Sequence, residues 1–192
     1  MPPKVRFDGA KIIDAAFEIV RQQGIDALSA RAIAQAAGCS TQPLYHEIGG
    51  MEAIRQAVTE KARSYFEEFI CSRAEQAPLP YLGSGMAYLR FAKEESKLFQ
   101  LLFMCHRTPE EQNHPGHDAT FEFAARMIAK NLGYSMETAR AFHLQSHVFV
   151  HGLAAMLTTG FIDWNEEEMI RLLRHQYRAL RLAFDTPQET NT

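Results

Sequence analysis

The sequence predicts an all-α protein, because apolar residues recur at three- and four-residue steps along nearly the whole chain of 192 residues. No run of alternating β-branched residues competes with this pattern, and the one obvious polar loop is RTPEEQNHPGHD, residues 107–118. We expect a three-helix N-terminal domain over residues 1–50 and a C-terminal helical bundle over 51–185, whose first helix, 51–74, connects the two. Residues 186–192 are expected to fray.

The first helix is expected between Asp8 and Gly24. Asp8 can cap its start, with Phe7 and Ile12 at the two positions of a hydrophobic staple. Gly24 supplies a stop at which a positive φ is tolerated. The residues that share its apolar face are Ile12, Ile13, Ala16, Phe17 and Val20.

Two short helices are expected to follow, one from a Ser29 cap through Ala37 and one from a Ser40 cap to about Glu47. Pro43 is compatible with the second of them. It lies in the first turn, where its missing amide hydrogen would have no intrahelical acceptor.

The remaining helices are mostly longer and end at helix breakers. The connecting helix stops before Pro78 and Pro80, and Asp163 with Glu166 resembles a capping box at the start of the last helix. We expect these helices at about 51–74, 81–95, 98–104, 118–131, 137–159 and 165–184.

The composition excludes several protein classes. With 46% hydrophobic and 22% charged residues, the chain is neither disordered nor collagenous, and three cysteines without a CxxC pair support neither a disulfide framework nor a zinc knuckle. The N-terminus lacks the apolar core of a signal peptide, and no apolar run approaches the roughly 18 residues of a membrane span. We therefore expect a cytoplasmic protein with no membrane partner.

The net charge of −3 argues against indiscriminate nucleic-acid binding. Residues 1–63 carry eight basic and seven acidic side chains, so this part of the chain is close to neutral. Any contact with DNA must therefore come from locally placed donors.

A helix-turn-helix is predicted within SARAIAQAAGCSTQPLYHEI, residues 29–48. Ile33 faces inward, Ala34 is small where two helices would cross, and Gly38 occupies the turn. Leu44 supplies a buried position in the following helix. Spacing alone leaves two interpretations open: a DNA-binding motif whose second helix enters the major groove, and an ordinary tight αα-corner.

Two segments, IIDAAFEIVRQQG and IDALSARAIAQAAGCSTQPLYHEI, follow one known pattern over roughly residues 10–60. They resemble the N-terminal region of the TetR family of bacterial transcriptional regulators. More weakly, AYLRFAKEESKLFQLLF (87–103) and FVHGLAAMLTTG (149–160) resemble the regulatory-domain variant that has a His-Gly pair in its penultimate long helix. The resemblance implies a homodimeric, ligand-responsive regulator, most often a repressor, that binds a near-palindromic DNA operator.

The resemblance places the DNA-contacting positions at the start of the second helix and along the third. They are Ser29, Arg31, Ser40, Thr41, Gln42, Pro43, Tyr45 and His46. Physical chemistry supports these roles, because helix N-termini at Ser29 and Ser40 present free amide hydrogens to phosphate and Arg31 adds a cation. Gln42 can bond the edge of an adenine with two hydrogen bonds. For Tyr45, a half-buried place in the three-helix core stays open as an alternative.

Two departures from the family pattern lie before and at the opening of the fourth helix. Gly49, Gly50 and Met51 stand where the family usually has a polar residue and a Lys, and Ile48 replaces a Phe. Loss of the Lys is expected to weaken nonspecific DNA affinity and to leave the fold unchanged.

An effector site is implied by the same resemblance. Residues 81–160 are rich in large aromatic and Met side chains, which by themselves indicate a core more often than a ligand pocket. Because the family encloses effectors among the equivalent helices, we expect a small, largely apolar effector here and no cofactor. The expected contacts are Phe91, Phe99, Phe103, Phe121, His147 and His151.

A dimer interface is expected on the last two helices. Residues 148–157 are apolar on nearly all sides, and such a helix needs partners on all sides. The resemblance implies a four-helix interface between two copies, whereas one larger self-contained bundle stays open as an alternative. The expected interface residues are Met156, Met169, Leu172, Leu173, Tyr177 and Leu180.

The alternative function is that of a helical-bundle enzyme or a metal-binding protein. His143, His147 and His151 recur at four-residue steps, so adjacent members could share a metal ion. All three together would extend about 12 Å along a helix, which is too far for one ion. The chain also has no HExxH, GxSxG, GxGxxG or P-loop motif, and we expect neither a metal site nor catalysis.

Overall fold

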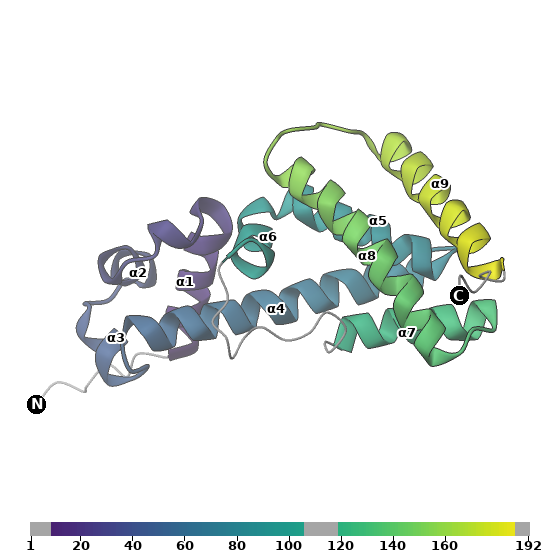
Figure 1. Ribbon diagram of the computed structural model, residues 1–192. Coiled ribbons are helices and arrows are strands. Elements are labelled where there is room, and N and C mark those ends of the chain that lie inside the picture. The colour runs from purple at the N-terminus through teal and green to yellow at the C-terminus, as the bar shows by residue number, and fades with distance from the viewer. Residues whose placement is uncertain (1–8, 106–118, 187–192) are drawn as a thin grey trace, which may run out of the picture. The chain divides into compact units, whose positions relative to one another are not determined.

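A computed structural model describes residues 9–105 and 119–186, and all regular secondary structure within them is helical, as the sequence predicts (Figure 1). The chain divides into two compact units. The described residues of the first are 9–66 and 95–105, and those of the second are 67–94 and 119–186.

The first unit contains the N-terminal helices, the beginning of a long helix and one short helix from later in the chain. In order these are α1 (Gly9–Gln23), the 3-10 turn η1 (Ile25–Ala27), α2 (Ala30–Ala37), α3 (Gln42–His46), α4 (Met51–Gln76) and α6 (Ser96–Phe103). Of these, α4 continues into the second unit after Phe66. The fully buried side chains of the first unit, which form its core, include Ile12, Val20, Ile33, Leu44, Ile54, Leu98 and Phe99.

Side-chain capping agrees with the prediction at α2 and differs at α3. Ser29 caps α2, because its Oγ accepts a hydrogen bond from the amide of Ala32 at 3.2 Å. The predicted Ser40 cap is wrong: α3 begins at Gln42, and Thr41 before it is already helical, with φ −73° and ψ −16° and no capping bond. A Ser cap needs an extended residue directly before the helix, which α3 does not have. The predicted Asp8 cap lies outside the described residues.

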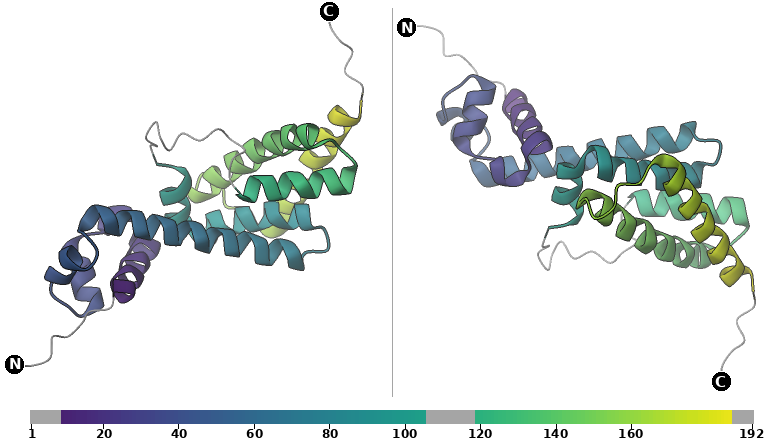
Figure 2. Two further views of the ribbon diagram at one scale, coloured as in Figure 1. Left: turned by 90° about the horizontal axis from the view of Figure 1, so that it is seen from below. Right: turned by 90° about the horizontal axis from the view of Figure 1, so that it is seen from above.

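The second unit contains the end of α4 and four further helices, α5 (Pro80–Glu94), α7 (Ala119–Leu132), α8 (Met136–Thr158) and α9 (Glu166–Asp185). Helix α5 packs against α7, α8 and α9, and α8 also packs against α7 and α9 (Figure 2). One buried cluster is formed by Ile128, Ala139 and Phe142, with aromatic rings of α5 and α9 packed around it. No helix among the described residues is long and apolar enough to cross a lipid bilayer.

The start of α9 corrects one prediction. The capping box predicted for Asp163 and Glu166 is wrong, because Asn165 is the N-cap and Glu168 completes the box. The Asn165 side chain accepts from the Glu168 amide at 3.0 Å, and the Glu168 carboxylate accepts from the Asn165 amide at 2.9 Å. The box lies two residues later than predicted.

Asp163 and Glu166 bond to α5 instead. Lys93 Nζ donates to Asp163 at 2.6 Å, and Arg90 holds Glu166 with two hydrogen bonds of 2.6 and 2.8 Å. These hydrogen bonds hold the pKa of both carboxyls below their usual range. The two acids therefore fasten the α8–α9 loop and the first turn of α9 to α5.

Candidate nucleic-acid interface

The turn between α2 and α3 has the geometry of a tight helix-turn-helix junction. Gly38 is left-handed, with φ 65° and ψ 34°, and its amide donates to the carbonyls of Ala34 and Gln35. The Cys39 amide donates to the same Ala34 carbonyl at 2.9 Å. A residue with a Cβ would strain this conformation, so the glycine allows α2 to stop and the chain to turn at once into α3.

Helix α3 is anchored by Leu44, which is completely buried. The predicted contact residues around it point away from the core: Ser40, Thr41, Gln42, Tyr45 and His46 are exposed, and Pro43 is half-buried. Tyr45 is 58% exposed, which excludes the alternative that its ring belongs to the three-helix core. Helix α3 therefore presents a nearly continuous polar and aromatic face to solvent.

The start of α2 adds two exposed side chains, Ser29 and Arg31. The Ser29 Oγ accepts the capping hydrogen bond from Ala32, so its hydroxyl proton is still able to donate to a phosphate. Arg31 forms no ion pair with the residues that the structure describes, and it is the one permanently charged cation among the predicted contacts.

The joint between α3 and α4 is built from two glycines with positive φ, 95° at Gly49 and 97° at Gly50. The Gly50 amide donates to Leu44 at 3.0 Å, and the Gly50 carbonyl accepts from Ile54 at 3.1 Å. A Cβ on Gly50 would lie 3.5 Å from the Tyr45 ring. The Tyr45 ring therefore packs beside Gly50, and the joint supports the exposed face of α3.

The residues predicted for the effector site fall into both units. Phe99 and Phe103 belong to the first unit, where their ring centroids lie 5.0 Å apart. The other four belong to the second unit: Phe91 and Phe121 are buried, and His147 and His151 are half-buried.

Within the second unit, tyrosines of α5 pair with histidines of α8. Tyr88 Oη lies 2.9 Å from His151 Nδ1, and Tyr81 Oη lies 3.1 Å from His143 Nδ1. His147 lies between these pairs, with its ring centroid 5.6 Å from Tyr88 and 6.0 Å from His151. Burial lowers the pKa of His151 and raises the pKa of Tyr81, so both favour their neutral forms.

From the sequence, Tyr81 and Tyr88 are expected only as two of the large aromatic side chains of residues 81–160. The two tyrosines are seven residues apart, and His143 and His151 are eight residues apart. These similar spacings on two packed helices are the signal that could have predicted the Tyr–His pairs. Two of the three histidines thus bond to tyrosine hydroxyls. Among residues 9–105 and 119–186 there is no group of three or more His, Cys, Asp or Glu arranged to hold a metal ion.

The residues predicted for the dimer interface differ in exposure. Met169 and Leu173 are buried within the single chain, and Leu172, Tyr177 and Leu180 are half-buried, so the apolar stripe of α9 covers its own bundle. In the sequence, such a stripe looks the same as an apolar stripe that packs against a second copy of the chain. Of the predicted set only Met156 is exposed. Other exposed apolar residues, Val148, Phe161 and Leu182, were not predicted as contacts.

This chain is similar to proteins described as transcriptional regulators. The family model of bacterial regulatory proteins, tetR family, matches residues 12–58. YobS of Bacillus subtilis (strain 168), an uncharacterized HTH-type transcriptional regulator, is 22% identical over 182 residues, which are 93% of this chain and 93% of that protein. A TetR-like transcriptional regulator from Rhodococcus sp. RHA1 has the same fold, with a TM-score of 0.64 and 17% identity over 97% of this chain and 100% of that one. These proteins are regulators and not enzymes, in agreement with the expectation from the sequence.

Proposed function

We propose that this chain, whose residues 12–58 match the tetR family model, is a DNA-binding regulator of that family, and that it acts as a homodimeric repressor released from a near-palindromic operator by a small, largely apolar effector. The observation that carries the proposal is the exposed face of α3 around its single buried anchor, Leu44. Operator binding would place the protein with the chromosome, in the cytoplasm.

Several residues of this face and of the start of α2 have roles that suit their chemistry. Gln42 reads an adenine edge in the major groove, and Thr41 and Pro43 contact thymine methyl groups. Tyr45 donates its hydroxyl to a phosphate, while Ser29 and Arg31 hold the backbone at the start of α2. Base contacts supply sequence preference, and phosphate contacts supply register and affinity.

An exposed stripe on α8 supports the dimer. Val148, Gly152 and Met156 follow one another at four-residue steps and are all exposed, so they lie on one face of the helix. A Cβ on Gly152 would meet no atom of the chain within 4 Å. A second copy can therefore approach the α8 backbone closely at this glycine, and apolar side chains on both sides would be buried by it.

Two copies related by a twofold axis present two identical α3 faces, and a DNA site that fits both consists of inverted half-sites about one helical turn apart.

The effector proposal rests on polar groups held in apolar surroundings. The buried Tyr88 and the half-buried His147 and His151 form a polar group in the second unit, which also contains the buried rings of Phe91 and Phe121. A mostly apolar site with a few fixed hydrogen-bonding groups is the usual chemistry of small-molecule recognition. Helix α4 contributes residues to both units, so a change at its second part can alter the DNA-binding part.

The experiment that tests the proposal is selection of duplexes from a random-sequence library by the purified protein. We expect the recovered duplexes to share an inverted repeat whose half-sites lie about one helical turn apart. Recovery of a single, non-repeated motif would contradict the dimer, and recovery of no shared motif would contradict sequence-specific binding.

A further inference from the structure

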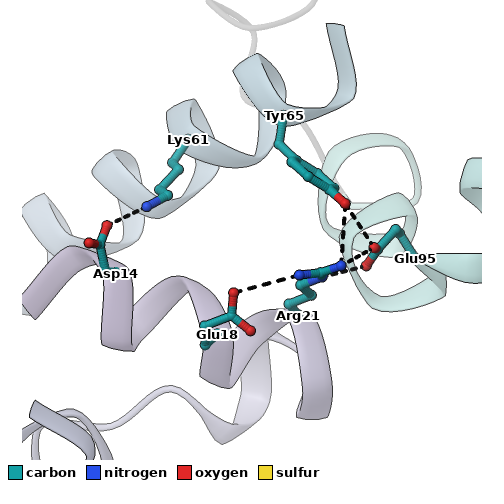
Figure 3. A network of polar contacts seen from close by, with 6 residues as sticks. All are labelled: Asp14, Glu18, Arg21, Lys61, Tyr65 and Glu95. Carbon is teal, nitrogen blue, oxygen red and sulfur yellow. Dashed lines mark hydrogen bonds and ion pairs between the residues drawn. The ribbon is translucent and has the colours of Figure 1, made fainter. Parts of the chain in front are cut away.

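A polar network joins three helices of the first unit, α1, α4 and α6 (Figure 3). Arg21 of α1 donates from Nε to one Glu95 oxygen at 2.8 Å and from Nη2 to the other at 2.5 Å. Tyr65 of α4 completes the triangle: its hydroxyl donates to Glu95 at 3.1 Å and accepts from Arg21 at 3.3 Å. We call Arg21, Tyr65 and Glu95 the polar clamp.

The clamp has the geometry of a strong interaction. The guanidinium and carboxylate meet with two parallel hydrogen bonds, and the Glu95 side chain is only 9% exposed. A carboxylate at this depth is costly unless it is paired, and Arg21 supplies that pairing for Glu95. The Arg21 carbon Cζ also lies 5.2 Å from the centroid of the Tyr65 ring.

The members of the clamp lie at special places in the chain. The first unit ends at Phe66 and resumes at Glu95, so Tyr65 and Glu95 flank two of the points at which the chain passes between units. Glu95 is also the residue that precedes α6, and its carbonyl accepts the Phe99 amide at 2.9 Å. Arg21 of α1 therefore bonds to one residue beside each of the two places where the chain leaves and re-enters the first unit.

Helix α1 connects the clamp to the DNA-binding surface. It packs against α2, and its buried residues Ile12 and Val20 belong to the same unit core as Ile33 of α2. A second contact supports the same arrangement, because a Cβ on Gly24, at the end of α1, would lie 3.5 Å from the Lys97 side chain in the first turn of α6.

We propose that Arg21 is a positioning residue for DNA binding, which holds the α1–α3 head at the two helices that connect it to the rest of the chain. The inference rests on the proposed binding to two half-sites. Specific binding needs both heads of a dimer at one fixed spacing, whereas nonspecific binding to phosphates has no such requirement. Loss of the clamp therefore lowers the preference for the operator and leaves nonspecific affinity largely unchanged.

The test compares variants on two DNA probes at one salt concentration. The probes are an inverted-repeat duplex recovered by selection and a duplex of the same length with that sequence scrambled. Arg21→Met removes the clamp. Arg21→Lys keeps the positive charge but cannot form the two parallel hydrogen bonds to the Glu95 carboxylate. Arg21→Met combined with Glu95→Met removes both charges, so no buried carboxylate is left unpaired if the single variant folds poorly.

Lys61→Met is the matched control. Lys61 of α4 pairs with Asp14 of α1, so this variant also removes an ion pair between α1 and α4, but one that does not involve α6 (Figure 3). Urea unfolding of every variant measures the folded fraction. A merely structural loss would reduce affinity for both probes by the same factor and leave their ratio unchanged.

We expect the ratio of the two affinities to fall about tenfold in Arg21→Met and in the double variant, as for a lost hydrogen bond to a charged group. The ratio should fall less in Arg21→Lys and change less than about twofold in Lys61→Met. An unchanged ratio in the double variant, or an equal fall in Lys61→Met, would overturn the inference. If the wild-type protein itself did not distinguish the probes, the proposed function would fail, and the inference with it.

Discussion

At the scale of single residues, the proposed DNA-binding face has little positive charge. Arg31 is the one permanent cation among the predicted contacts, and Met51 stands at the opening of α4, where the family usually has a Lys. The remaining predicted contacts, such as Gln42 and Tyr45, are neither Lys nor Arg. We therefore expect affinity to depend more on directed hydrogen bonds than on counterion release.

Replacing Tyr45 with Phe tests the phosphate contact. The ring is 58% exposed and packs beside Gly50, so removal of the hydroxyl leaves the fold intact. Because phosphates carry no base identity, we expect binding to weaken by about 1–2 kcal/mol on every duplex alike. Affinities for the selected and scrambled duplexes measure this. A loss confined to the selected duplex would instead mean that Tyr45 reads a base.

Replacing Met51 with Lys tests how close the start of α4 comes to DNA. We expect tighter binding to any duplex and a salt dependence steeper by a slope of about −0.9 per half-site, the value of one additional phosphate contact. Met51→Leu is the control, since it keeps a side chain of similar size and adds no charge. The salt series is measured by fluorescence anisotropy, and an unchanged slope in Met51→Lys would place this helix start away from the phosphates.

At the scale of the helices, the sequence predicts which segments are helical and where each helix begins and ends better than it predicts the capping residues. Helices α5, α8 and α9 begin and end within one or two residues of the expected positions, because hydrophobic periodicity over three or more turns is a strong signal. The start of α9 shows why caps are harder. Both Asp163 with Glu166 and Asn165 with Glu168 fit the capping-box pattern, and only the contacts with α5 decide between them.

Variants at the start of α9 test this assignment. We expect Asn165→Ala to lower the free energy of unfolding by about 1 kcal/mol, since it removes the cap. Asp163→Asn removes only an exposed ion pair and should cost less. The pKa values of Asp163 and Glu166 are lowered in the fold, so their contribution is present at neutral pH and is lost as the pH falls through those pKa values. Urea unfolding at two pH values measures both effects, and an equal cost of the two substitutions at neutral pH would contradict the assignment.

At the scale of the whole molecule, the sequence predicts an N-terminal DNA-binding part and a helical bundle. It does not predict which apolar residues of the bundle pack within their own chain and which are left exposed. Met169 and Val148 are both apolar residues on the last two helices, yet Met169 is buried in its own chain and Val148 is 65% exposed. Periodicity identifies an apolar face and does not say whether it meets the same chain or a second one. The six residues predicted for the effector site show the same limit, since they fall into two units.

Replacing Val148 with Glu tests the dimer. The side chain is exposed in the single chain, so the helix should still fold, but a charge buried between two copies is costly. We expect the dimer dissociation constant, measured by sedimentation equilibrium, to rise at least about tenfold, which is 1.4 kcal/mol. Asn131→Glu on the exposed end of α7 is the control. Equal dissociation constants for wild type and Val148→Glu would remove α8 from the interface.

We propose that two copies read inverted half-sites with α3, and duplex selection repeated with Gln42→Ala tests this reading base pair by base pair. Gln42 is exposed in the first turn of α3, and a bidentate bond to adenine is worth about 1–3 kcal/mol of discrimination. We expect the variant still to select the inverted repeat but to lose preference at one base pair in each half-site, at symmetric positions. A motif identical to that of the wild-type protein, or a loss at only one of the two half-sites, would contradict it.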